Sequence, residues 1–200
     1  MKGRDLLLLL AVLAAIGLWD YSHRPLWHPP GVLAAEAPQQ QAVDNATTPW
    51  TKGDIAIKPL AKFAMVARVL GRADYHWDTE SQLVPTDLAL GWGRMSDSAV
   101  LGNVEISQST RFYYWRVQEF PIPEREIIES SANMHLIAAE RNVERAIGRA
   151  RVGDIVNFDG YLVEADWPNG YKWTSSLTRS DSGGGACELV WVEHFEIAPR

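Results

Sequence analysis

The segment 153–193 is the stretch that most constrains the fold. It reads GDIVNFDGYLVEADWPNGYKWTSSLTRSDSGGGACELVWVE. Apolar and polar residues alternate in three runs, which is typical of β-strands, and Pro168-Asn169-Gly170 is a turn signal between two of them. A glycine run leads into the third run, which holds the only cysteine of the chain, Cys187. These features predict a small β-barrel or twisted sheet.

Further strands and one or two short helices are expected before this segment. Alternation of apolar residues predicts strands at 53–58, 61–70, 100–106, 111–117 and 133–138. Short helices are expected at 124–131 and from Asn142, a residue type that suits a helix N-cap. The stretch 75–98 is interrupted by Pro85, Gly91 and Gly93 and is interpreted as an ordered loop with one helical turn. The predicted fold class is therefore mainly β, within the α+β class.

The N-terminus is an apolar run that follows two basic residues. Lys2 and Arg4 precede residues 6–19, which are uninterrupted in their apolar character. As a helix this run spans about 21 Å, which is short of a ~30 Å hydrocarbon core but suits a short anchor extended by its flanks. Bulky polar residues follow it, so residues 1–20 are interpreted as an uncleaved membrane anchor, with a cleaved signal and secretion to the periplasm as the alternative. The basic end predicts an inner-membrane protein with its body in the periplasm.

Residues 21–49 are expected to form a proline-rich tether, and residues 50–200 a β-rich exported domain. The tether lacks periodicity, and its His23 and His28 are interpreted as solvated. The net charge of -6 and the absence of an obvious Lys/Arg cluster argue against nucleic acid as a partner. The expected partners are the membrane, through the N-terminal segment, and an envelope protein or a glycan.

Cys187 and His135 form a candidate catalytic pair, because a cysteine nucleophile needs a base nearby. Between them come the turn Gly153-Asp154 and the strand Tyr161-Leu162-Val163. This order resembles the sortases, membrane-anchored cysteine transpeptidases built on a β-barrel, in which a His, a Cys and an Arg downstream of the Cys act. The resemblance implies a cysteine-dependent transpeptidase or hydrolase. The chain departs from the family in having Gly-Gly-Gly-Ala before the cysteine and Arg200 as the single downstream arginine. A buried structural cysteine is the alternative.

The loop 91–97, GWGRMSD, is a candidate ligand-binding loop. Its glycines would let a ligand approach the backbone, and Trp92 is expected to be exposed there, with Arg94 and Asp97 beside it. The alternative is a rigid structural turn.

A second candidate loop holds Ser176, Arg179 and Asp181. These residue types suit an anion or an acyl group, and the alternative is an Arg–Asp pair that pins the glycine loop. The histidines lack His-x-His or His-x-x-x-His spacing and the chain lacks Cys-x-x-Cys, so the sequence predicts neither a metal site nor a cofactor.

The chain as a whole has a short anchor, a tether and the motifs GWGRMSD, NMHLI and SSLTRSDSGGGACEL. This pattern resembles exported or membrane-anchored proteins of Gram-negative bacteria, and the resemblance implies a topology and no activity. Nine tryptophans provide either core packing or an aromatic platform for a glycan or peptide. The preferred function is a binding or assembly module of the cell envelope.

Overall fold

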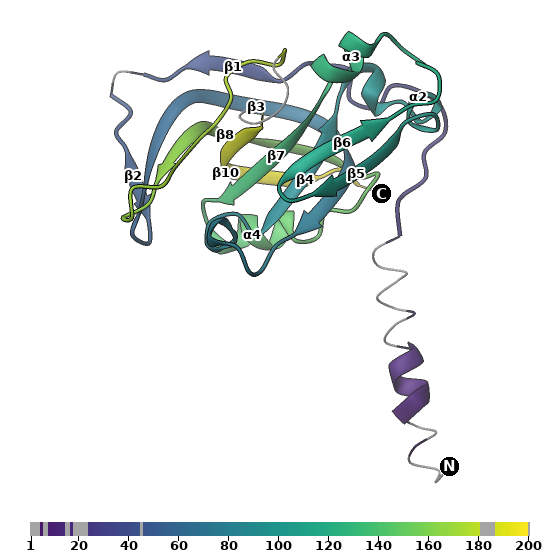
Figure 1. Cartoon of the computed structure of the whole chain (residues 1–200), viewed down its shortest axis with the longest axis horizontal. Helices are drawn as coiled ribbons and strands as arrows, with labels where there is room; N and C mark the ends of the chain where they lie inside the picture. The colour runs from purple at the N-terminus through teal and green to yellow at the C-terminus, as the bar shows by residue number, and fades with distance from the viewer. Residues whose placement is uncertain are drawn as a thin grey trace.

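The computed structural model describes residues 5, 8–14, 17, 24–44, 46–180 and 187–199. Figure 1 shows a strand-rich body with the N-terminal segment extending away from it. Residues 8–14 are helical, and within the described ranges no helix is both long enough and apolar enough to cross a membrane. The predicted mainly β fold class is confirmed.

Strands dominate the body, with short helical segments between them. The strands are β1 (Gln39–Ala42), β2 (Trp50–Lys52), β3 (Ile55–Asp74), β4 (Thr86–Gly91), β5 (Glu105–Ser109), β6 (Phe112–Arg116), β7 (Ser131–Ala138), β8 (Ile155–Asp166), β9 (Lys172–Thr174) and β10 (Glu188–Ile197). The helical segments are η1 (Thr79–Gln82), η2 (Gly93–Ser96), α2 (Ser98–Leu101), α3 (Glu124–Glu129) and α4 (Arg141–Ile147).

Five of these strands close into a ring. The hydrogen-bonded order is β3, β4, β7, β10 and β8, and β8 pairs again with β3. Neighbours in the ring are antiparallel, except that β7 and β10 are parallel. Outside the ring, β1 and β2 pair with β3, β9 pairs with β8, and β5 and β6 form a separate hairpin. The result is a small barrel with short strands attached to its edges.

β3 closes the ring because it pairs on both of its edges. Its residues 56–68 pair with β8, and its residues 68–74 pair with β4. Register shifts between Pro59 and Ala61 and between Val69 and Gly71 mark β-bulges, which bend a strand and increase its twist. The sequence predicted two strands separated by Pro59. The first bulge explains why one strand continues through it, since a bulge tolerates proline.

The interior of the ring is apolar and is closed at one end by α4. It contains alternate residues of the five strands, among them Phe63, Leu88 and Phe158. Val143 and Ile147 of α4 join the same core. Asn142 was expected to be the N-cap, but the N-cap is Glu140 and the helix begins at Arg141.

Two further apolar clusters cover the outside of the ring. One joins β3, β8 and β10 through residues such as Ile57 and Leu189, with Trp50 and Trp173 packed against it. The other lies under the segment 92–130, and Met95 of this segment is one of its buried residues. Several of the tryptophans therefore take part in packing.

The stretch 75–98, expected to be a loop, contains a strand of the ring. β4 is buried along its whole length and pairs with β3 and β7. Pro85 directly precedes β4, and Gly91 ends it. At Gly91 an added Cβ would lie 2.4 Å from the carbonyl oxygen of Met95, so this glycine permits a close approach of two backbone segments. The strand expected at 100–106 is also displaced, because α2 occupies its beginning and β5 starts at Glu105.

The proline-rich segment lies along the body. The Leu26 amide donates to the Val152 carbonyl oxygen at 2.8 Å, and β1 adds to β3. His28, expected to be solvated, places Nε2 2.8 Å from the Gly153 carbonyl oxygen. His23 lies outside the described residues. The ordered body therefore begins well before residue 50.

Replacing Gly160 with alanine is expected to destabilise the barrel by more than about 2 kcal/mol. An added Cβ would lie 1.9 Å from the Trp191 carbonyl oxygen, so β8 or β10 would have to move. Urea unfolding followed by tryptophan fluorescence measures the effect. Gly102→Ala is the matched control, because its nearest neighbour would be 3.4 Å away, and it should change the unfolding free energy by less than about 0.5 kcal/mol. Equal effects of the two substitutions would contradict this explanation.

Candidate functional site

A group of charged and aromatic side chains lies on the outer face of β4 and β7. We call it the Arg111 cluster, and it consists of Tyr75, Asp78, Asp87, Arg111, His135 and Trp173. Asp87 of β4 lies opposite His135 of β7, and Trp173 comes from β9. Arg111 comes from the turn between β5 and β6. The cluster therefore joins segments that are far apart in the sequence.

Arg111 is at the centre of the cluster. Its Nε and Nη2 each donate to an oxygen of Asp78 at 2.8 Å, and its Nη1 donates to Asp87 Oδ1 at 3.0 Å. The guanidinium carbon lies 3.8 Å from the ring centroid of Tyr75 and 5.9 Å from that of Trp173. Only a planar guanidinium can bind one carboxylate with two hydrogen bonds, reach a second and stack on aromatic rings. The hydrogen bonds from Arg111 lower the pKa of Asp78, and they outweigh the effect of its partial burial.

The backbone at Arg111 is held as firmly as its side chain. Thr110 and Arg111 form a two-residue hairpin turn with φ values of 49° and 70°, a conformation that costs non-glycine residues about 1 kcal/mol each. The hydroxyl of Tyr75 accepts a hydrogen bond from the Arg111 amide at 3.1 Å. The side-chain amide of Asn133 donates to the Arg111 carbonyl oxygen at 3.0 Å. These contacts fix the hairpin turn against the ring.

His135 and Asp87 form the buried end of the cluster. Nδ1 of His135 lies 2.9 Å from Asp87 Oδ1, although the two groups are not aligned for a hydrogen bond. The imidazole also packs on Trp173, with ring centroids 4.4 Å apart. The exposed fractions of His135 and Asp87 are 2% and 0%, and Asp87 Oδ2 has no hydrogen-bond partner among the described residues. A buried carboxylate of this kind depends on a nearby cation, which Arg111 supplies.

Cys187 lies on the same face as His135. In the parallel pairing of β7 and β10, Leu189 is opposite His135, and Cys187 comes two residues before Leu189. The Cys187 Sγ lies 4.0 Å from the Arg111 carbonyl oxygen, and the residue is partly exposed. The structure thus brings the two predicted catalytic residues to one face and adds Asp87 and Arg111, to which the sequence assigned no role there. Among the described residues, no three His, Cys, Asp or Glu side chains are grouped to hold a metal ion.

The loop 91–97 binds the N-terminal segment of the same chain. The amide of Gly31 donates to Asp97 Oδ1 at 2.8 Å. The amides of Leu33 and Ala34 each donate to Ser96 Oγ at 3.0 Å. Of the side chains expected to bind a ligand, Asp97 therefore has a peptide partner within the chain, and so does its neighbour Ser96.

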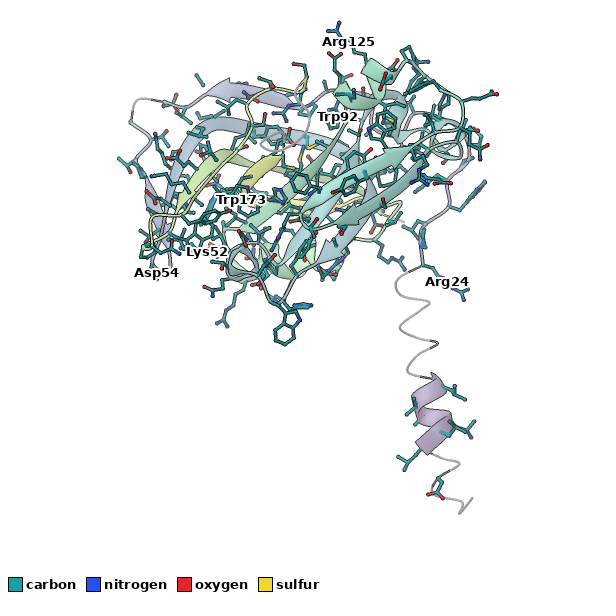
Figure 2. The ribbon with its side chains drawn as sticks, in the orientation of Figure 1. Arg24, Lys52, Asp54, Trp92, Arg125 and Trp173 are labelled. Carbon is teal, nitrogen blue, oxygen red and sulfur yellow. The ribbon has the colours of Figure 1, made fainter. Side chains whose placement is uncertain are left out.

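The expectation that Trp92 is exposed is wrong. Its exposed fraction is 3%, because the indole belongs to the interior core, and Figure 2 shows it among other side chains beneath α3. Arg94 forms an ion pair with Glu126 of α3, and Asp97 caps α2 by accepting the Ala99 amide at 2.8 Å. These contacts match the alternative interpretation of the loop as a structural turn, and a ligand role for Trp92, Arg94 and Asp97 stays a prediction.

The second predicted loop closes the end of the barrel where β10 begins. Arg179 Nη1 lies 2.6 Å from Glu188 Oε1, and Glu188 is 1% exposed. Ser176 Oγ donates to the Thr178 carbonyl oxygen at 3.1 Å, within its own turn. Asp181 lies outside the described residues. The acidic partner described for Arg179 is thus Glu188, which the sequence did not identify.

Comparison with known proteins found no matching family model, curated protein or solved structure. The connectivity of the ring is nevertheless that of the OB-fold, a five-stranded Greek-key barrel. In OB-folds, ligands bind on the outer face of the second and third strands and at the loops after the first and fourth. The corresponding parts here are β4, β7, residues 75–85 and the connection from β8 to β10. These parts meet at the Arg111 cluster.

Arg111→Gln is expected to destabilise the protein by about 3–5 kcal/mol, because Asp87 would remain buried without its cation. Urea unfolding measures the loss, and Asp87→Asn added to the variant should restore part of it. Arg116→Gln is the matched control, since that side chain is 83% exposed and its ion-pair partner is 3.9 Å away. If Arg111→Gln is as stable as Arg116→Gln, the proposed role of Arg111 is wrong.

Proposed function

We propose that the chain is a membrane-anchored protein of the cell envelope and that its barrel body is a binding module. The apolar run after Lys2 and Arg4 supports an inner-membrane anchor with the body in the periplasm, and cleavage of that run with release to the periplasm is the alternative. The ligand class that we favour is an oligosaccharide strand of the envelope, with an envelope protein as the alternative partner.

The observation that carries this proposal is a pair of aromatic residues beside the Arg111 cluster, Trp167 and Tyr171, which we call the aromatic rim. Tyr171 is 40% exposed and lies 5.2 Å from Trp167, measured between ring centroids. Burial and the nearby Glu80 raise the pKa of Tyr171, so the two loops that correspond to OB-fold binding loops lie close together here. Aromatic faces provide apolar surface for sugar rings, and the polar groups around them provide hydrogen bonds.

Charge and architecture favour a sugar over a nucleic acid. OB-folds bind oligosaccharides as well as oligonucleotides at this surface. The net charge of -6 repels a polyanion, whereas an uncharged glycan is not affected by it. Sugar binding by other OB-folds supports the proposal by analogy. The residues of the aromatic rim provide the argument that is specific to this chain.

The proposal predicts saturable binding of a soluble, uncharged oligosaccharide, for which an oligomer of N-acetylglucosamine is the probe. Tyr171→Ala should weaken this binding between about two- and tenfold, which is the range expected for one aromatic contact. Calorimetric titration of the full chain in detergent measures the affinity. Tyr114→Ala is the matched control, because Tyr114 is 50% exposed but belongs to β6 and packs on Phe112. An absence of binding, or equal weakening by the two substitutions, would overturn the glycan proposal.

A cysteine-dependent transpeptidase or hydrolase is the second candidate function. It is supported by the placement of Cys187 on the same face as the His135–Asp87 pair. In such an enzyme His135 would act as the base, and Asp87 would orient the imidazole. The burial of His135 favours the binding module instead, since a substrate must reach the base.

Alkylation of Cys187 separates the two candidates. A binding module predicts that iodoacetamide reacts with Cys187 no faster than with a free thiol, with a midpoint at or above about pH 8.5. Mass spectrometry follows the modification of the folded chain as a function of pH, and His135→Gln is the companion variant. A fast reaction with a midpoint well below pH 8 would support the enzyme if His135→Gln abolishes it. That result would contradict the proposal of a binding module.

A further inference from the structure

The exposed side of α4 carries a row of arginines. Arg141 and Arg145 are four residues apart, so they lie on one side of the helix, and both are exposed. The opposite side of α4 packs into the barrel. Glu140 and Glu144 are also exposed, so the surface is mixed in charge but richer in cations than the acidic body as a whole. Local spacing does not reveal this group, because apolar and acidic residues separate the arginines.

The arginines border a cleft of about 880 Å³. The cleft lies between α4 and residues 81–86, and Leu83, Leu136 and Ile147 contribute apolar surface to it. Lys52 also lines the cleft, where burial lowers its pKa although the charge of Glu144 acts in the opposite direction. Cations beside apolar surface are complementary to an amphiphilic anion.

The chain enters the body close to this surface. Leu26 and His28 contact the carbonyl oxygens of Val152 and Gly153, only a few residues beyond the end of α4. The apolar run ends at Trp19, and seven extended residues reach at most about 25 Å. In Figure 1 the described part of the N-terminal helix lies below the body, and α4 lies along the lower edge of the body. An anchored segment would therefore hold α4 near the membrane.

Two tryptophans are strongly exposed, one next to the cleft and one where the chain enters the body. Trp77 is 97% exposed and lies just before η1, whose Ser81 and Gln82 line the cleft. Trp27 is 80% exposed and follows Leu26, the residue bound to Val152. Indole side chains favour the interface between membrane and water. Their positions agree with a surface that faces lipid.

We propose that α4, together with Lys52 and Trp77 beside its cleft, forms a surface that lies on the anionic phospholipid headgroups of the membrane that holds the N-terminal segment. This inference rests on the membrane anchoring proposed above. Arg141, Arg145 and Lys52 contact the headgroups, and Trp77 lies at the level of the interface.

The test uses the full chain in nanodiscs of phosphatidylcholine alone or with one quarter phosphatidylglycerol. Hydrogen exchange of residues 139–153 should be slower in the anionic discs. Each arginine near an anionic surface strengthens binding about fivefold, so Arg141→Gln combined with Arg145→Gln should weaken docking roughly 25-fold and remove the difference between the discs. The matched control is Arg116→Gln combined with Arg125→Gln, two exposed arginines away from α4, and it should keep the difference. Figure 2 shows Arg125 on the side of the body opposite Lys52.

Flotation of the full chain with the same lipids separates the two proposals. A chain that fails to float with lipid of either composition would overturn the anchor, and with it the docking. A chain that floats with both lipids but exchanges equally in both discs would overturn the docking alone. If the control variant also loses the difference in hydrogen exchange between the two discs, the total charge of the body, and not α4, is responsible. That result would overturn the docking proposal.

Discussion

The pairing of β3 along both of its edges positions every other part of the body. One edge pairs with β8 and the other with β4, and the two bulges let a single strand turn from one neighbour to the next. With the ring closed, no edge of these five strands is left as a continuous row of unpaired backbone groups. β1 and β2 then add to β3 where its pairing leaves room, which draws the N-terminal segment onto the body.

The Arg111 cluster compensates a carboxylate that the closed ring leaves buried. β4 and β7 are central strands, yet Asp87 and His135 point outward from them into a region covered by the chain. A buried carboxylate is costly unless a cation and hydrogen bonds compensate it. Arg111 provides this compensation, and its second carboxylate, Asp78, fastens the loop 75–85 to the same point. The hairpin, the loop and the ring are therefore coupled through one guanidinium.

The sequence predicted the features that depend on local pattern. The alternation of apolar residues in β7 and β8 predicted strands and hence the mainly β class. The apolar side of α4 predicted which of its residues join the core. β4 was missed because Pro85 and Gly91 look like loop residues, whereas they lie at the ends of a short buried strand. The roles of Asp87 and Arg111 depend on pairing between distant segments, which no local spacing reveals. Trp92 was misjudged because glycines around an aromatic residue suit a close backbone approach as well as an exposed loop.

Both ends of the barrel are closed, so a ligand can reach only its outer surface. α4 seals one end with apolar residues, and the Arg179–Glu188 pair lies at the other, beside Phe63. A ligand therefore does not need the interior, which is packed as a core. Tyr171 of the aromatic rim lies beside Glu80, and the next residues, Ser81 and Gln82, line the cleft that Arg141 and Arg145 border, so the two surfaces adjoin. A body held to lipid through α4 would keep the rim at a fixed height above the membrane, where a strand of envelope polymer could reach it.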